Sequence, residues 1–114
     1  MSNNISNNAS KPIMLVTGGS RGIGAATAIG AAARGYQVAF SYLNNKTAAD
    51  DVVKQIQNAG GHALAIQADV GIEDHVLRLF KTVDETMGTL SVLVNNAGML
   101  EQKMRLDQMD LGRW

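Results

Sequence analysis

Apolar and polar positions fall into alternating blocks along the chain. Short, almost continuously apolar runs are typical of strands buried in a parallel sheet, and they occupy residues 13–17, 36–42, 62–68 and 90–94. Between these runs, residues 22–34, 46–59 and 73–87 have the alanine content or the three-to-four spacing of apolar residues that indicates helices. Gly35, Gly60 and Gly88 directly follow these segments, as C-terminal caps do. A further helix is expected to begin near Leu106.

Strands that alternate with helices in this way predict an α/β fold with a doubly wound parallel sheet. Right-handed crossovers place the first three strands in the order 3-2-1. The fourth strand is then expected beside the first, which gives the order 3-2-1-4. Ligands bind such sheets at the carboxyl ends of the strands where the order reverses, so the turns after the first and fourth strands are the places to look for a site.

The chain has 114 residues, enough for one domain. Residues 1–11 are rich in Asn and Ser and are expected to form a disordered tail, which leaves residues 12–114 for the domain. Ten basic and ten acidic residues give zero net charge, which disfavours a nucleic-acid or membrane-surface partner. The absence of cysteine excludes disulfides, thiolate metal sites and a thiol nucleophile. No apolar run suggests a membrane span, and we expect a cytoplasmic protein.

The turn after the first predicted strand is rich in glycine. Glycine lets the backbone turn tightly and approach a pyrophosphate, and the helix that follows directs its N–H groups at the phosphates. The general fingerprint G-x-G-x-x-G/A is met only in part, because Thr27 stands at its third small position, with alanines on either side. A P-loop is rejected because no Gly-Lys-Ser/Thr follows, while a glycine-rich helix entry without function is the simpler alternative. The candidate phosphate-binding residues are Gly18, Ser20, Arg21, Gly22, Ile23 and Gly24.

The end of the second predicted strand bears on cofactor choice. An NAD site usually carries Asp or Glu about 20 residues past the glycines, to bind the ribose hydroxyl. Here the first acid is Asp50, inside the next helix. A 2′-phosphate is therefore tolerated, and Arg21 is predicted to pair with it, helped by Ser41 and by Asn44 or Lys46. The predicted cofactor is NADP(H), with NAD the less favoured choice.

Three motifs in order resemble the short-chain dehydrogenase/reductase family. They are Thr-Gly-x-x-x-Gly-x-Gly at residues 17–24, Asp69-Val70 after the third strand, and Asn95-Asn96-Ala97-Gly98 after the fourth. The similarity covers residues 12–114, and its spacing resembles short-form reductases such as 3-oxoacyl carrier-protein reductases and glucose dehydrogenases. The family's glycine pattern ends at Gly24, so Thr27 is no departure from it.

The resemblance implies roles for residues in the second and third motifs. Asp69 would accept a hydrogen bond from the adenine amino group, and Val70 would pack on the ring. The ribose and nicotinamide would be bordered by Asn96, Ala97 and Gly98. Asn95 would brace the strand ends, and Thr17 would reach across to the backbone of the turn that Asn95 begins.

The resemblance also implies an NADP(H)-dependent oxidoreductase that transfers hydride between nicotinamide and a carbonyl or alcohol substrate, as a homo-oligomer. The family's Ser and Tyr-x-x-x-Lys would lie after Trp114, so we predict no catalytic residue within the chain. Tyr42 and Lys46 have the spacing but belong to the adenosine side. The alternative is a non-catalytic NADP-binding regulatory or sensor module on the same fold. A methyltransferase is a weaker candidate, because its ligand's ribose would require an acid near Tyr42.

Two further expectations concern the fourth strand and the histidines. Leu90, Val92 and Val94 are expected on one face of the strand and Leu93 on the other. Two helices cover one face of the sheet and one covers the other, so the fourth strand would stay partly uncovered and residues 1–114 alone would be poorly soluble or molten. The two histidines share no ligand partners and receive no metal role.

Overall fold

The computed structural model describes residues 11–96 of the chain. The strands are β1 (Ile13–Thr17), β2 (Gln37–Tyr42), β3 (His62–Gln67) and β4 (Val92–Asn95), and the helices are α2 (Gly22–Ala33), α3 (Lys46–Asn58) and α4 (Glu73–Thr86). Each prediction for this part of the chain is confirmed to within one residue, except that β4 begins two residues later than expected. The predicted tail and the helix near Leu106 lie outside the described residues.

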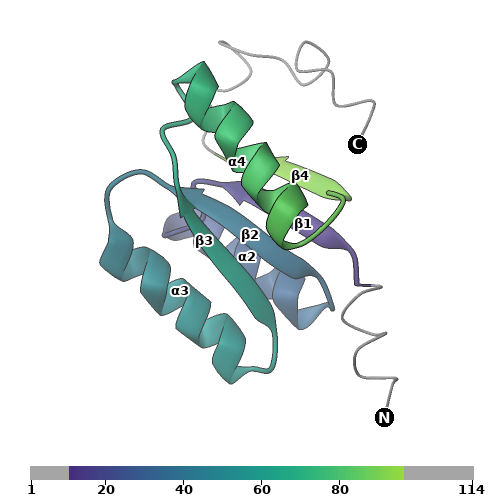
Figure 1. Ribbon diagram of the computed structural model, residues 1–114. Coiled ribbons are helices and arrows are strands. Elements are labelled where there is room, and N and C mark those ends of the chain that lie inside the picture. The colour runs from purple at the N-terminus through teal and green to yellow at the C-terminus, as the bar shows by residue number, and fades with distance from the viewer. Residues whose placement is uncertain (1–10, 97–114) are drawn as a thin grey trace.

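The four strands form one parallel sheet in the order β3-β2-β1-β4, as the α/β prediction required. Leu15, in the middle of β1, is paired with Ala39 of β2 on one side and with Leu93 of β4 on the other. The order reverses between β1 and β4, so the carboxyl ends of these two strands lie side by side at one edge of the sheet (Figure 1).

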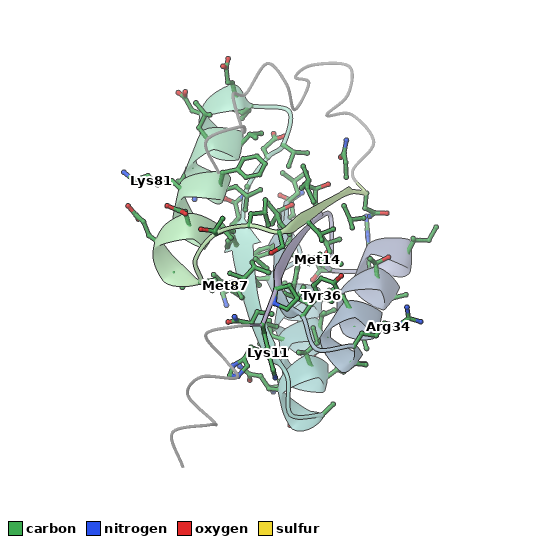
Figure 2. All side chains as sticks on the ribbon, turned by 90° about the vertical axis from the view of Figure 1, so that its right-hand side faces the viewer. Lys11, Met14, Arg34, Tyr36, Lys81 and Met87 are labelled. Carbon is green, nitrogen blue, oxygen red and sulfur yellow. The ribbon has the colours of Figure 1, made fainter. Side chains whose placement is uncertain are left out.

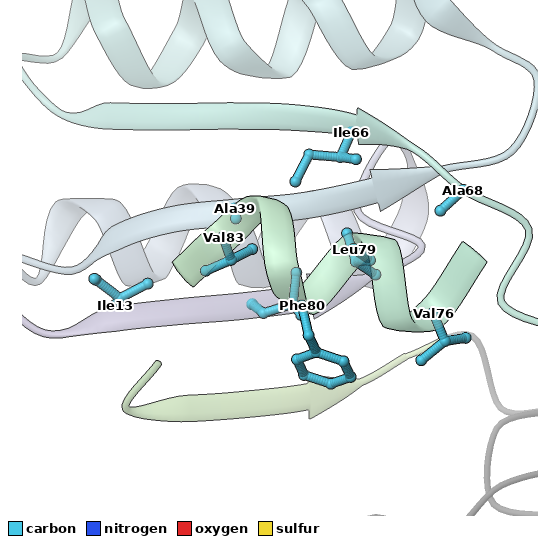
Figure 3. Packing of buried hydrophobic residues seen from close by; sticks show 9 residues of the cluster. Ile13, Ala39, Ile66, Ala68, Val76, Leu79, Phe80 and Val83 are labelled. Atoms are coloured by element: carbon cyan, nitrogen blue, oxygen red, sulfur yellow. The ribbon is translucent and has the colours of Figure 1, made fainter. Parts of the chain in front are cut away.

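Helices cover the two faces of the sheet unequally (Figure 1). On one face, α2 and α3 pack against Met14 and Val16 of β1. On the other face, α4 is the helix that buries Ile13 and Leu15. Figure 3 shows α4 directing Leu79, Phe80 and Val83 at the sheet. The alternating faces of β1 therefore belong to two separate hydrophobic clusters.

One expectation about β4 is wrong. Val92 and Val94 pack with the cluster under α2 and α3, and Leu93 with the cluster under α4, as predicted. Leu90, however, lies on the α4 side with Leu93 and not with the two valines. It precedes the strand, in the connection after Gly88 (φ 115°), so the two-residue alternation of a strand does not extend to it.

The outward faces of α3 and α4 are largely polar, whereas α2 is rich in alanine and carries the exposed Ile23. Figure 2 shows Arg34, just past α2, and Lys81 of α4 pointing outward on opposite sides of the sheet. Within residues 11–96 there is no helix with the length and apolar character needed to cross a membrane. The same part of the chain contains no group of three His, Cys, Asp or Glu side chains placed to hold a metal ion.

Candidate functional site

The glycine turn between β1 and α2 is held by the end of β2. Gly18 and Gly22 adopt positive φ angles of 69° and 62°, which non-glycine residues rarely adopt. The Gly18 N–H donates to Oγ of Ser41 (3.0 Å), and the Gly19 N–H donates to the Ser41 carbonyl (2.9 Å). Ser41 is buried, and through these two hydrogen bonds it holds the glycine turn in place.

Close packing fixes the other glycines of the turn. A Cβ on Gly24 would lie 2.0 Å from the Gly18 carbonyl oxygen and 2.6 Å from Nδ2 of Asn96, and one on Gly19 would lie 2.5 Å from Cβ of Phe40. Asn96 uses the same Nδ2 to donate to the Gly18 carbonyl at 3.0 Å. The turn is therefore clamped between β2, the start of α2 and the residue that follows β4.

The ends of β1 and β4 are tied by the predicted contact. Oγ1 of the buried Thr17 lies 3.1 Å from Oδ1 of Asn95 and 3.5 Å from the Val94 carbonyl oxygen. Thr17 reaches Asn95, the first residue of the predicted turn, as expected, although the contact is to its side chain where the prediction named the backbone of the turn. The shorter contact is to the Asn95 side chain, with the Val94 backbone at the limit of the range. Ala97 and Gly98 lie outside the described residues.

Two adjoining hollows open at the carboxyl edge of the sheet. Both are lined by Gly18, Arg21, Tyr42 and Leu43. One extends along Ser20, Asn44 and Asn45. The other extends along Ser41, Ala68, Asp69 and Val70. Arg21 is the charged residue among the four that line both hollows.

The glycine turn, the Asp69-Val70 pair and Arg21 thus line one crevice. Gly22 and Ile23 lie outside the hollows on the exposed start of α2, where Ile23 is 78% exposed, and Gly24 is buried beneath the turn.

The hollow that extends along Ser20, Asn44 and Asn45 has no carboxylate among its lining residues. Asp50, one turn into α3, instead pairs with Lys46 at 3.1 Å, and both side chains are largely exposed. The hydrogen bond to Asp50, and then the charge of that carboxylate, raise the pKa of the Lys46 ammonium above its ordinary value. The residues around this end of the crevice are therefore neutral or cationic, which suits an anionic group.

The sequence and structure both match known proteins. A family model described as short chain dehydrogenase matches residues 12–114. The chain belongs to the short-chain dehydrogenase family.

Relatives within this family are oxidoreductases by name. The "uncharacterized oxidoreductase YgfF" of Escherichia coli K12 is 45% identical over 101 residues, which are 89% of this chain and 41% of the relative. A 3-oxoacyl-acyl-carrier-protein reductase of Synechocystis is 46% identical over 102 residues, with 90% and 41% covered. This chain therefore spans about two fifths of the length of these short-chain dehydrogenases.

Solved structures of the family have the same fold. A dehydrogenase/reductase from Sinorhizobium meliloti superposes with a TM-score of 0.76 at 36% identity, covering 95% of this chain and 45% of that one. A short-chain dehydrogenase/reductase from Serratia marcescens gives 0.75 at 36% identity, with 87% and 42% covered. The α/β fold inferred from the pattern of strands and helices is that of short-chain dehydrogenases.

Two residues of the site had no role in the sequence analysis. The Asp69 N–H donates to Nδ1 of His75 at 3.0 Å, and Asn45 caps α3 by accepting from the Ala48 N–H at 3.0 Å. Asn directly before a helical pattern is a recognised N-cap signal, so Asn45 was available to sequence reasoning. The hydrogen bond between Asp69 and His75 depends on the path of the loop before α4, which the sequence pattern does not predict.

Proposed function

We propose that this chain is the NADP(H)-binding part of an oxidoreductase that transfers hydride between nicotinamide and a carbonyl or alcohol group. The observation that carries the proposal is the crevice at the sheet edge: Arg21 stands between its two hollows, and no carboxylate follows β2 on its rim. An NAD site normally carries an acid there, which would repel a 2′-phosphate.

In this proposal, each of four parts of NADP(H) has its own place at the carboxyl edge of the sheet. The pyrophosphate would lie on the start of α2, where the glycine turn lets the backbone approach and unpaired N–H groups point outward. The 2′-phosphate would pair with Arg21, with Asn44 or Lys46 nearby and the hydroxyl of Ser41 beneath. The adenine would lie in the hollow of Asp69 and Val70, and the nicotinamide beside Asn96, Ala97 and Gly98.

In this function the residues of the chain bind and orient, and the cofactor supplies or accepts the hydride. Arg21 and the α2 N-terminus neutralise phosphate charge, Asp69 fixes the adenine, and Ile23 offers apolar surface to the nicotinamide side. In the same proposal, the acid/base residues of the family belong to the part of the longer relatives that this chain does not span. A cytoplasmic location and a homo-oligomeric assembly are part of the same proposal and rest on the family alone.

Cofactor choice is tested by replacing one cation. Arg21→Ala, in the protein as its gene encodes it, should weaken NADP(H) binding by about ten- to a hundredfold, the value of a lost charge-assisted contact. NAD(H) binding should hardly change, because NAD(H) lacks the 2′-phosphate. Isothermal titration with both cofactors measures the two effects.

Arg34→Ala is the matched control, since Arg34 is exposed just beyond α2 and points away from the crevice (Figure 2). It removes the same charge and should leave both affinities unchanged. An equal loss for NADP(H) and NAD(H) in Arg21→Ala would refute the assignment of Arg21 to the 2′-phosphate. Tight NADP(H) binding without oxidation or reduction of any carbonyl or alcohol in a substrate panel would instead favour a regulatory module.

A further inference from the structure

His75 lies at the first turn of α4, beside the loop that forms the adenine end of the crevice. Its Nδ1 accepts the backbone N–H of Asp69 at 3.0 Å across six residues of chain, in a partly buried setting. Asp69 in turn holds the rest of the loop. Its Oδ1 accepts the Gly71 N–H at 2.9 Å, and its carbonyl accepts the Ile72 N–H at 2.9 Å.

The contact fixes the chemical state of the ring. A neutral imidazole has one nitrogen that donates and one that accepts. Because Nδ1 accepts here, the proton of the neutral ring must be on Nε2. A ring with a second proton donates from both nitrogens, and it would then meet the Asp69 N–H with a donor instead of an acceptor.

We propose that His75 is a positioning residue for the adenine end of the cofactor site, and that it acts only as the neutral ring with its proton on Nε2. The inference rests on the proposed function, because it assigns to Asp69 and Val70 the adenine of NADP(H). By holding the Asp69 backbone, His75 fixes where the Asp69 carboxylate and the Val70 side chain face the hollow. Cofactor affinity should therefore fall when the acceptor at the Nδ1 position is removed.

The variant His75→Asn provides the control that keeps the acceptor. Oδ1 of asparagine is bonded to Cγ, as Nδ1 of histidine is, so it can accept the same N–H at nearly the same place. His75→Phe keeps a ring of similar width and removes the acceptor.

The charged groups near His75 are retained in both variants. The loop and the first turns of α4 carry the carboxylates of Asp69, Glu73 and Asp74 and the guanidinium of Arg78, which donates to the Gln67 carbonyl at 2.9 Å. β1, β3 and β4 bring no charged residue to this edge of the sheet. Comparison of the native protein with His75→Asn cancels all of these contributions.

The experiment measures the dissociation constant of NADP(H) for the native protein and for both variants under the same conditions. His75→Phe should bind NADP(H) about three- to tenfold more weakly, the effect of losing one hydrogen bond, whereas His75→Asn should bind it within about twofold of the native protein.

A second readout follows the hydrogen bond without the cofactor. Nitrogen-15 chemical shifts of the His75 ring should show an unprotonated Nδ1, and exchange of the Asp69 amide should be faster in His75→Phe than in His75→Asn. Equal affinities in all three proteins, or an equal loss of affinity in His75→Asn and His75→Phe, would overturn the inference while leaving NADP(H) binding in place. Failure of the native protein to bind NADP(H) would remove the proposed function and this inference with it.

Discussion

Gly24 and Gly30 are in the same helix, and an added methyl group meets very different surroundings at the two positions. At Gly24 it would lie 2.0 Å from the Gly18 carbonyl oxygen, which is backbone and cannot rotate away. At the exposed Gly30 it would meet no atom within 4 Å. The two substitutions therefore separate the effect of a methyl group on helix propensity from its effect on the glycine turn.

We predict opposite outcomes for the two alanine variants. Gly24→Ala should lower the free energy of unfolding by about 1–3 kcal/mol, as overpacking does, and weaken NADP(H) binding because the turn must shift. Gly30→Ala should raise the free energy of unfolding by about 0.5–1 kcal/mol and leave cofactor binding unchanged. Urea denaturation and cofactor titration measure both effects. A Gly24→Ala variant as stable as the native protein would show that the turn is less tightly packed than described.

The sequence predicts which residues meet at the edge of the sheet. It predicts less well which contacts they make there. Thr17 and Asn95 follow from the strand order, because the ends of adjacent parallel strands must lie side by side. The bracing of Gly18 by Ser41 did not follow, since Ser41 was read as a residue for the 2′-phosphate. Side-chain partners across a turn depend on backbone positions of tenths of an ångström, which pattern and spacing do not encode.

At the scale of the element, the start of α3 combines a helix cap with the rim of the cofactor crevice. Asn45 accepts the Ala48 N–H at 3.0 Å and also lines the hollow beside Arg21. Asp is an equally good N-cap, but it brings a negative charge, whereas alanine removes the cap without adding a charge. The two substitutions therefore act on different properties.

Asn45→Ala should lower the free energy of unfolding by about 1 kcal/mol and leave the preference for NADP(H) intact. Asn45→Asp should keep the stability within about 0.5 kcal/mol but reduce NADP(H) affinity relative to NAD(H), because the carboxylate repels the 2′-phosphate. Thermal unfolding and parallel titrations with the two cofactors distinguish the cases. An unchanged cofactor ratio in Asn45→Asp would place the 2′-phosphate away from this hollow.

Element type and order were predictable because the apolar runs and the glycines that follow the helices are unambiguous here. Gly35 and Gly60 have positive φ angles of 99° and 90° directly after α2 and α3, which is why those ends were found to within a residue. The start of β4 was not found, because Leu90 is apolar through burial against the α4 cluster and not through membership of the strand. Hydropathy alone does not distinguish these two causes.

At the scale of the whole molecule, the two faces of the sheet are stabilised unequally. α2 and α3 share one face, whereas the other depends on the four buried residues of α4: Val76, Leu79, Phe80 and Val83 (Figure 3). β4 stands at the edge, paired with β1, and Val92, Leu93 and Val94 are each only half-buried. Strands of parallel sheets are normally covered on both faces, so this exposure is unusual for a strand of this composition.

We therefore expect a further segment of the protein, corresponding to the remainder of its longer relatives, to cover β4. In the full-length protein, Leu93→Ala should lower the free energy of unfolding by about 2–5 kcal/mol. Leu79→Ala, at a fully buried position of α4, should lower it by a similar amount. Leu77→Ala is the control on the same helix, where the side chain is 48% exposed and the cost should stay near 0.5 kcal/mol. Residues 1–114 produced alone should show no cooperative thermal transition, because several apolar side chains worth about 1.5–3 kcal/mol each would stay in water. Two results together would show instead that β4 is stable as an open edge. Residues 1–114 would unfold cooperatively as a monomer, and Leu93→Ala would lower the free energy of unfolding no more than Leu77→Ala does.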